Sequence, residues 1–226
     1  MTERRRPGSM HADLDLPLIL LVGGATGTGK STVTTEVAYR LGITRVSSTD
    51  VVRQTMRAFF SPDFMPSIHY SSFEAGAAVT ARDGEVADPN LLGFLDQTRH
   101  VLVGVNAVLE RALTEGYSIA LEGVHLVPGL LPSRLEGAVV VQCVLAIEDE
   151  EEHASHFWVR DDASEGLRPV EKYLRALPAI RLIQDHLVER ARRAGVGVVE
   201  SSRLEEAVGG VIDLAAAEVE HARATA

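Results

Sequence analysis

Short apolar runs alternate with longer stretches of helical periodicity along the chain. The apolar runs have the length of β-strands and span residues 18–22, 45–49, 118–121, 139–147 and 196–199. The first is apolar without interruption and the fourth is interrupted only by Gln142. Such runs are typical of strands buried on both faces of a parallel sheet. The second run is the most polar of the five, so it is the weakest strand prediction.

Between these runs, apolar residues recur every three to four positions. This spacing predicts helices over residues 31–41, 51–60, 91–114, 173–194 and 204–224. Gly42 and Gly116 stand where two of these helices end, and Asp50 stands at the expected N-cap of another. Alternating strands and helices predict an α/β fold of three layers, with a five-stranded parallel sheet between helices.

Two stretches interrupt this alternation, at about 60–90 and about 150–172. The first is rich in proline and glycine, and the second begins with the acidic run Glu148–Glu152. Acidic residues are favoured at a helix N-terminus, which is the reading we prefer for that run. We expect one domain over residues 14–226 with two insertions, preceded by a flexible leader at residues 1–13.

Composition narrows the class of protein. The chain is 46% hydrophobic, enough for one full core. Its 32 acidic and 22 basic residues give a net charge of −10, which argues against non-specific nucleic-acid binding. With Cys143 as the single cysteine, an intramolecular disulfide and a four-cysteine zinc site are excluded. The apolar run at 16–25 is too short to span a membrane. We therefore expect a cytoplasmic protein with no nucleic-acid or membrane partner.

Residues 24–31 read GATGTGKS and match the P-loop pattern G-x-x-x-x-G-K-[ST]. The match follows a predicted strand and opens a predicted helix, so a ligand-free glycine turn is the weaker reading. Backbone N–H groups of such a loop surround the β-phosphate, the lysine reaches the β- and γ-phosphates, and the serine hydroxyl binds Mg²⁺. The motif predicts ATP and Mg²⁺ as cofactors. The residues expected to bind the nucleotide are Gly24, Thr26, Gly27, Thr28, Gly29, Lys30, Ser31 and Thr32.

Several classes of P-loop protein can be separated by what the sequence contains. The Asn-Lys-x-Asp signature of guanine-nucleotide switches does not occur. The length suits a small-molecule kinase of the nucleoside monophosphate kinase type, in which two insertions close over the substrates. We therefore assign the stretch at 60–90 to the acceptor and the stretch at 150–172 to a lid.

Candidate acceptor residues follow the second strand. Asp50, Arg53 and Arg57 are spaced three and four apart, which places them on one helix face. A carboxylate could take the proton of an acceptor hydroxyl, and guanidinium groups could hold its anionic groups. The alternative is an N-cap with an i,i+3 ion pair. Three polar residues of the first insertion are further candidates for the acceptor pocket, with a capped turn as the alternative: His69, Ser71 and Ser72.

The third strand ends in an acidic residue, Glu122, followed by Gly123 and His125. An acid after an apolar strand in a P-loop protein holds Mg²⁺, directly or through water, so Ser31 and Glu122 are the expected metal residues. Glu122 and His125 are also candidates for contact with the substrate. For His125 an ordinary loop histidine is the alternative.

The predicted lid carries two histidines and two arginines. His153 and His156 have i,i+3 spacing, but no third or fourth ligand accompanies them, which disfavours a zinc site. Arg160 and Arg168 are candidates for stabilising the charge of a transferring phosphoryl group. We assign Arg160 to catalysis and nucleotide binding and Arg168 to the substrate.

Taken together, several segments resemble the 2-phosphoglycerate kinases. The resemblance runs from about residue 18 to 200, and its most specific piece is EGVHLVPG at residues 122–129. The other pieces are residues 23–32, Ser48-Thr-Asp50 with Arg53, residues 69–74, His156-Phe with Arg160, and residues 180–184. The resemblance implies transfer of the ATP γ-phosphoryl group to the 3-hydroxyl of 2-phosphoglycerate, giving 2,3-diphosphoglycerate.

On this reading Lys30 and Asp50 are catalytic, and Asp50 orients or deprotonates the acceptor hydroxyl. Arg82 and Arg181 join Arg53 and Arg57 as candidates for the anionic groups. The alternatives are a kinase for another hydroxyl, such as that of a sugar acid, a nucleoside or an antibiotic, and an ATP sensor without catalysis. A small anionic acceptor is the expected partner, and the protein is expected to be a monomer or a homodimer.

Overall fold

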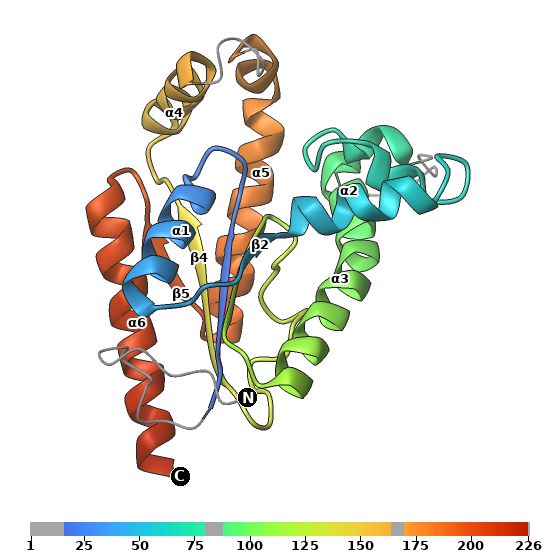
Figure 1. The fold of residues 1–226 in the computed structure, drawn as a ribbon. Helices are drawn as coiled ribbons and strands as arrows, with labels where there is room; N and C mark the ends of the chain where they lie inside the picture. Colours follow the sequence, from blue (N-terminus) through green and yellow to red (C-terminus); the bar gives the residue numbers. More distant parts are fainter. Residues whose placement is uncertain (1–15, 80–87, 164–169, 226) are drawn as a thin grey trace.

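The computed structural model describes residues 16–79, 88–163 and 170–225. Five parallel strands form one sheet in the order β2-β3-β1-β4-β5 (Figure 1). Their bounds are β1 (Leu18–Gly24), β2 (Val46–Ser48), β3 (Ile119–Glu122), β4 (Val139–Ala146) and β5 (Gly197–Glu200). The predicted five-stranded parallel sheet is confirmed, with strand ends shifted by one or two residues. Because the strands are parallel, their carboxyl ends meet at one edge.

Alternate residues of the central strand face two different helical layers. Leu18, Leu20 and Val22 pack against α1 (Lys30–Leu41) and α6 (Leu204–Thr225), whereas Ile19 and Leu21 pack against α3 (Pro89–Glu115). α5 (Val170–Ala194) covers the same face as α3 beside β4 (Figure 1). Every β1 residue is buried, which is why the run shows no polar alternation. The predicted three-layer architecture is confirmed.

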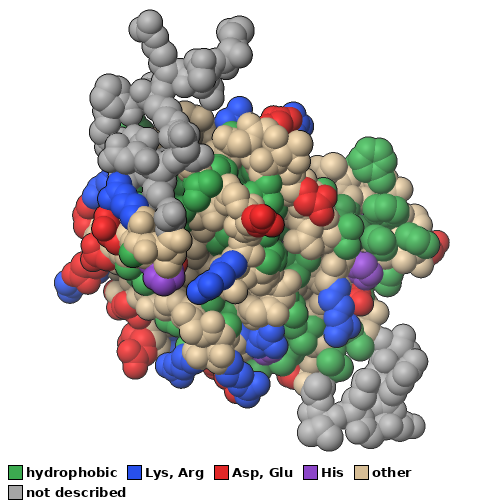
Figure 2. All heavy atoms as spheres, turned by 90° about the horizontal axis from the view of Figure 1, so that it is seen from below, with side chains coloured by type: hydrophobic (Ala, Val, Ile, Leu, Met, Phe, Trp, Pro, Cys, Tyr) green, Lys and Arg blue, Asp and Glu red, His purple; other side chains and the backbone are tan. Residues whose placement is uncertain are grey.

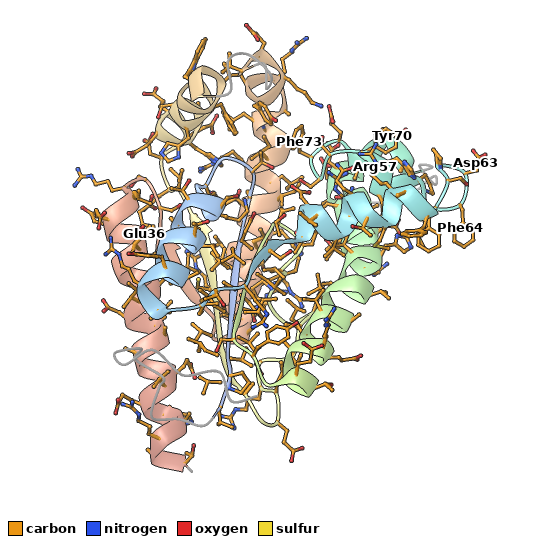
Figure 3. All side chains as sticks on the ribbon, in the orientation of Figure 1. Glu36, Arg57, Asp63, Phe64, Tyr70 and Phe73 are labelled. Carbon is orange, nitrogen blue, oxygen red and sulfur yellow. The ribbon has the colours of Figure 1, made fainter. Side chains whose placement is uncertain are left out.

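The first insertion projects from the α3 side of the sheet, to the right in Figure 1. It follows α2 (Thr49–Phe59) and consists of two short 3₁₀ helices, η1 (Pro66–His69) and η2 (Ala75–Ala78), and the start of α3. The sequence predicted irregular structure after α2 and missed both short helices. η2 packs tightly on α3, since a Cβ at Gly93 would lie 2.1 Å from the Ala75 carbonyl oxygen. Phe64 is exposed in this insertion (Figure 3), and Phe59 is exposed at the end of α2.

The second insertion contains α4 (Glu150–Ala163), which packs on the first part of α5 above the sheet edge (Figure 1). Its first turn holds three glutamates, as expected for a helix N-terminus. The opposite end of the molecule, seen in Figure 2, carries both basic and acidic side chains among hydrophobic ones. None of the described helices combines the length and hydropathy needed to cross a bilayer.

Candidate active site

The P-loop connects β1 to α1 at the carboxyl edge of the sheet. Gly24, Gly27 and Gly29 all have positive φ, which side-chain-bearing residues rarely adopt. A Cβ at Gly24 would lie 2.6 Å from the Leu145 carbonyl oxygen, so the loop also passes too close to β4 for a side chain. Gly29 precedes α1 as its N-cap, so the loop leads directly into the positive end of that helix.

Two side chains of the P-loop bind the same backbone oxygen. The hydroxyl of buried Thr28 donates to the Ala25 carbonyl at 3.0 Å, and the Lys30 ammonium donates to it at 2.6 Å. Lys30 is thereby held across the loop, where a phosphate would meet both its charge and the N-terminus of α1.

Helix α4 is attached to the P-loop by two histidine rings. His153 Nε2–H donates to the Thr26 carbonyl at 2.8 Å, and His156 Nδ1–H donates to the Gly27 carbonyl at 3.0 Å. Phe157 packs over the same turn, so that a Cβ at Gly27 would lie 2.7 Å from its ring. The i,i+3 histidine spacing therefore reflects packing on the P-loop. No group of three metal-ligating side chains occurs among the described residues.

Ser31 and Glu122 meet at the ends of α1 and β3. The Ser31 hydroxyl donates to Glu122 Oε1 at 2.9 Å. Carboxylate and hydroxyl oxygens are hard donors of the kind that Mg²⁺ prefers, and a nucleotide-bound Mg²⁺ needs only one or two protein oxygens. The two residues predicted to hold the metal are therefore brought together in an arrangement that fits it.

Asp50 lies in the first turn of α2 and is not its N-cap, so that detail of the sequence prediction was wrong. The N-cap is Ser48, whose hydroxyl accepts from the Val51 N–H at 3.2 Å. The Asp50 side chain remains 69% exposed and faces the open edge of the sheet. Arg53 Nε donates to Asp50 Oδ1 at 3.2 Å. The i,i+3 ion pair of the alternative interpretation is therefore present, without the N-cap.

The pKa of Asp50 is set by opposing influences. Partial burial raises it, but the nearby positive charge of Arg53, its hydrogen bond and the charge of Lys30 lower it, and the net direction is downward. Asp50 is therefore a carboxylate at neutral pH. It can accept a hydrogen bond from a hydroxyl group.

Two cavities adjoin at Asp50. The first, of about 610 Å³, runs from the P-loop past Glu122 to Ser201, Ser202 and Leu204 after β5. The second, of about 660 Å³, lies between α2, residues 71–73 and the start of α5. Asp50, Thr26 and Ser72 line both. The arrangement provides two adjacent compartments with a carboxylate at their junction.

Several predicted acceptor residues line the second cavity, namely Arg53, Ser71 and Ser72. Arg53 is largely buried, and its Nη1 donates to the carbonyls of Ile68 and Tyr70 at 3.0 and 2.9 Å. Among the described residues, Arg53 Nη2 has no hydrogen-bond partner, so this nitrogen is the part of the guanidinium left for a ligand.

Other predicted residues are not brought to the cavities. Arg57 donates to Gln54 on α2 (Figure 3), His69 Nε2–H donates to the Phe60 carbonyl, and Arg181 caps the carbonyls of Ile147 and Glu148. Arg82 and Arg168 lie outside the described residues, as does the side chain of Arg160. The residue 1–13 leader lies outside them as well.

His125 lies beneath the site and not in it. The ring is fully buried between Thr49 Oγ1 at 2.8 Å and Gln97 Oε1 at 2.9 Å. Burial lowers its pKa to about 3, so the ring is neutral. Gly123 packs closely against Thr49, because a Cβ there would lie 1.8 Å from Thr49 Oγ1.

Sequence reasoning missed two groups of residues that line the cavities. Ser201, Ser202 and Leu204 line the first, and Phe73 and Tyr173 line the second with an edge-to-face contact at 5.8 Å. The position of the first group, directly after a strand of the parallel sheet, was a usable signal. No pattern in the sequence pairs Phe73 with Tyr173.

No family model matches this chain. Curated 2-phosphoglycerate kinases from Thermococcus kodakarensis and Methanocaldococcus jannaschii are each 42% identical to it, over 195 and 193 residues. The enzyme of that name from Pyrococcus horikoshii is 39% identical over 201 residues. The chain is similar to the 2-phosphoglycerate kinases over most of its length.

The similarity to these 2-phosphoglycerate kinases covers 85–88% of this chain and 61–65% of the relatives. The chain thus spans less than two thirds of the length of the curated relatives it matches. The resemblance expected from the sequence is confirmed over the part that aligns.

A solved structure supports the fold assignment. A gluconokinase from Sinorhizobium meliloti 1021 superposes with a TM-score of 0.52, covering 93% of this chain and 98% of its own. At 15% identity, this likeness bears on the fold alone. The α/β fold of P-loop kinases is confirmed.

Proposed function

We propose that this chain is an ATP-dependent kinase that phosphorylates a hydroxyl group of a small anionic acid, with 2-phosphoglycerate as the acceptor. The observation that carries the proposal is the junction of the two cavities at Asp50. The name of the similar curated enzymes supplies the acceptor. A γ-phosphoryl group held by the P-loop would face an acceptor hydroxyl beside Asp50.

In the proposed reaction, the oxygen of the acceptor hydroxyl forms a bond to the γ-phosphorus while the bond to the β–γ bridging oxygen breaks. ADP leaves with that electron pair. The proton of the hydroxyl passes to Asp50 or, through it, to water. Since phosphoryl transfer proceeds through a loose transition state, positioning and charge compensation account for most of the catalysis.

Each side chain has a defined task in this proposal. Lys30 and the P-loop N–H groups hold the β- and γ-phosphates, and Arg53 Nη2 meets an anionic group of the acceptor. Ser31 and Glu122 would hold the Mg²⁺ that accompanies ATP. When bound, Mg²⁺ compensates charge on the β- and γ-phosphate oxygens. The residues after β5 would line the space for the nucleoside part of ATP.

A mass-resolved assay tests the proposal. Protein and Mg²⁺-ATP are incubated with 2-phosphoglycerate and, separately, with 3-phosphoglycerate and glycerate. A diphosphoglycerate formed from 2-phosphoglycerate, absent with Lys30→Ala, is the expected result. Product from glycerate alone would keep the kinase and overturn the acceptor. ATP binding without product from any acid would overturn catalysis as proposed.

A further inference from the structure

A chain of buried hydrogen bonds connects the two sides of the candidate active site. Its members are Thr49 on α2, His125 after β3, and Gln97 on α3. All three side chains are at most 1% exposed. This series of hydrogen bonds ends at the carbonyl oxygens of Ser67 and Tyr70. These residues directly precede the segment at 71–73, which lines the second cavity, called the acceptor cavity below.

The direction of every hydrogen bond follows from the last link. Gln97 Nε2 lies 2.6 Å from the Ser67 carbonyl oxygen and 3.0 Å from that of Tyr70, so this atom is the donating nitrogen of the amide. Gln97 Oε1 must then accept from His125 Nε2–H. His125 Nδ1 therefore lacks a proton and accepts from the Thr49 hydroxyl. A neutral ring satisfies both contacts, and a charged ring would not.

The two ends of this chain lie at functionally different places. Thr49 precedes Asp50 and packs on Gly123, next to Glu122, at the phosphate side. The carbonyls of Ser67 and Tyr70 belong to the acceptor side, where the Tyr70 carbonyl also accepts from Arg53. The next residues, Ser71 to Phe73, line the acceptor cavity.

We propose that His125 and Gln97 are positioning residues. They fix the position of residues 67–73, of which residues 71–73 line the acceptor cavity, relative to Asp50. This inference rests on the proposed function for its kinetic consequence. Neither side chain touches a substrate. Each acts through residues 67–73. Loss of either side chain therefore weakens binding and alignment of the acceptor, while the affinity of the P-loop for ATP is unchanged.

Amide substitutions of His125 can remove its hydrogen bond to Gln97 or its hydrogen bond to Thr49 separately. In His125→Asn, the amide oxygen replaces Nδ1 and keeps the bond from Thr49, while the bond to Gln97 is lost. In His125→Gln, the amide nitrogen replaces Nε2 and keeps the bond to Gln97. Gln97→Met removes the bonds to both carbonyls and keeps the volume. Thr98→Val is the matched control, because Thr98 is buried on the same helix and its hydroxyl has no partner among the described residues.

Two measurements test the proposal, namely steady-state kinetics with both substrates and hydrogen–deuterium exchange of the free protein. His125→Asn and Gln97→Met should raise the KM for the acceptor about tenfold, the effect of losing a buried hydrogen bond, and change the Kd of ATP less than about twofold. Amides of residues 67–73 should exchange faster in both variants. His125→Gln should stay close to the unmodified protein, and Thr98→Val should match it.

Both single variants lose the hydrogen bond between His125 and Gln97. The double variant His125→Asn, Gln97→Met should therefore have no larger effect than Gln97→Met alone. Unchanged exchange at residues 67–73 in His125→Asn and Gln97→Met would overturn the proposal, whatever the activity. Equal rises in the KM for the acceptor and the Kd of ATP would also overturn it. If the unmodified protein phosphorylates no acid, the proposed function fails, and the exchange experiment alone decides this inference.

Discussion

The contact between Ser31 and Glu122 joins residues that are 91 positions apart in the sequence. Each comes from a motif that the sequence reveals, and the parallel sheet brings both to one edge. Both residues also line the first cavity, beside the P-loop. At the residue scale, this is the part of the site that sequence reasoning predicted most fully.

Glu122→Gln tests that pair. The amide keeps the shape of the side chain but removes the charge that attracts a divalent cation. We expect the Mg²⁺ concentration for half-maximal turnover to rise about tenfold and kcat to fall about a hundredfold. Turnover is measured across a Mg²⁺ titration. Glu36→Gln is the control, since Glu36 pairs with Arg40 on an exposed face of α1 (Figure 3); an equal effect of both variants would contradict the assignment.

Asp50→Asn tests the carboxylate at the junction of the cavities. The amide cannot take a proton, so kcat should fall by about 10²–10⁴-fold while the Kd of ATP stays within about twofold. Asp63→Asn, at an exposed position in the first insertion, serves as control (Figure 3). Near-normal turnover of Asp50→Asn would exclude Asp50 as the group that accepts the proton.

The lowered pKa of Asp50 has a consequence for the pH profile. Because Arg53 and Lys30 favour the charged form, the carboxylate persists as pH falls until pH is below 3.8, the ordinary value. We therefore expect no loss of kcat from protonation of Asp50 between pH 7 and about 5. A pH–rate profile checks this, and Arg53→Met should move the acid limb to higher pH.

Gly123→Ala tests the close packing of Thr49. The new Cβ would lie 1.8 Å from Thr49 Oγ1, and φ is +154°. We expect the free energy of unfolding to fall by about 3 kcal/mol, from overpacking and backbone strain together. At Gly116, φ is +66° and a Cβ would meet nothing within 4 Å, so Gly116→Ala should cost only about 1 kcal/mol. Urea unfolding measures both, and equal losses would contradict the packing argument.

At the scale of elements, strands and most helices could be predicted because burial imposes a local periodicity. β1 is buried on both faces and reads as an unbroken apolar run. The short helices η1 and η2 could not be predicted, because each spans only four residues and is held by its contacts with α3. Tertiary packing determines such short segments, and local sequence preference does not.

The attachment of α4 to the P-loop is an element-scale feature with a testable effect. His153→Leu removes the hydrogen bond to the Thr26 carbonyl, whereas His153→Gln can place an amide N–H near the former Nε2. We expect the Leu variant to bind ATP about tenfold more weakly and the Gln variant to bind normally. Isothermal titration calorimetry with Mg²⁺-ATP measures both. Normal binding by His153→Leu would show that the P-loop keeps its conformation without this hydrogen bond.

At the scale of the whole molecule, buried histidines make stability depend on pH. Burial lowers the pKa values of His125, His153 and His186 below 6.5 in the folded state. As pH falls below 6.5, the unfolded chain binds protons that the folded chain does not, so the free energy of unfolding falls. For His125 this continues to about pH 3.

Chemical unfolding at pH 7, 6 and 5 measures this dependence. His125, whose pKa is lowered to about 3, contributes a slope approaching about 1.4 kcal/mol per pH unit once pH is well below 6.5. His125→Asn should be less stable than the unmodified protein at pH 7 but should lose less stability on acidification. Identical slopes for the two proteins would contradict a neutral, buried His125.

Sequence reasoning could group residues that belong to a local motif, but it could not identify contacts between residues far apart in the sequence. His125 was a candidate for substrate contact, with an ordinary loop histidine as the alternative; its ring is buried and binds Gln97, 28 positions away. His153 binds a carbonyl 127 positions away. Such contacts depend on which elements meet in space, and one sequence contains no local signal for that.

The carbonyl oxygen of Tyr70 is the acceptor for both Arg53 and Gln97. Every amino acid has a backbone carbonyl oxygen, so no substitution of residue 70 removes this shared acceptor. A substitution can remove these hydrogen bonds only at the two donors, Arg53 and Gln97. The Tyr70 side chain takes part in neither hydrogen bond. Removing the shared acceptor itself would require a change in the backbone, such as an ester in place of the peptide bond to Ser71, which weakens the oxygen as an acceptor.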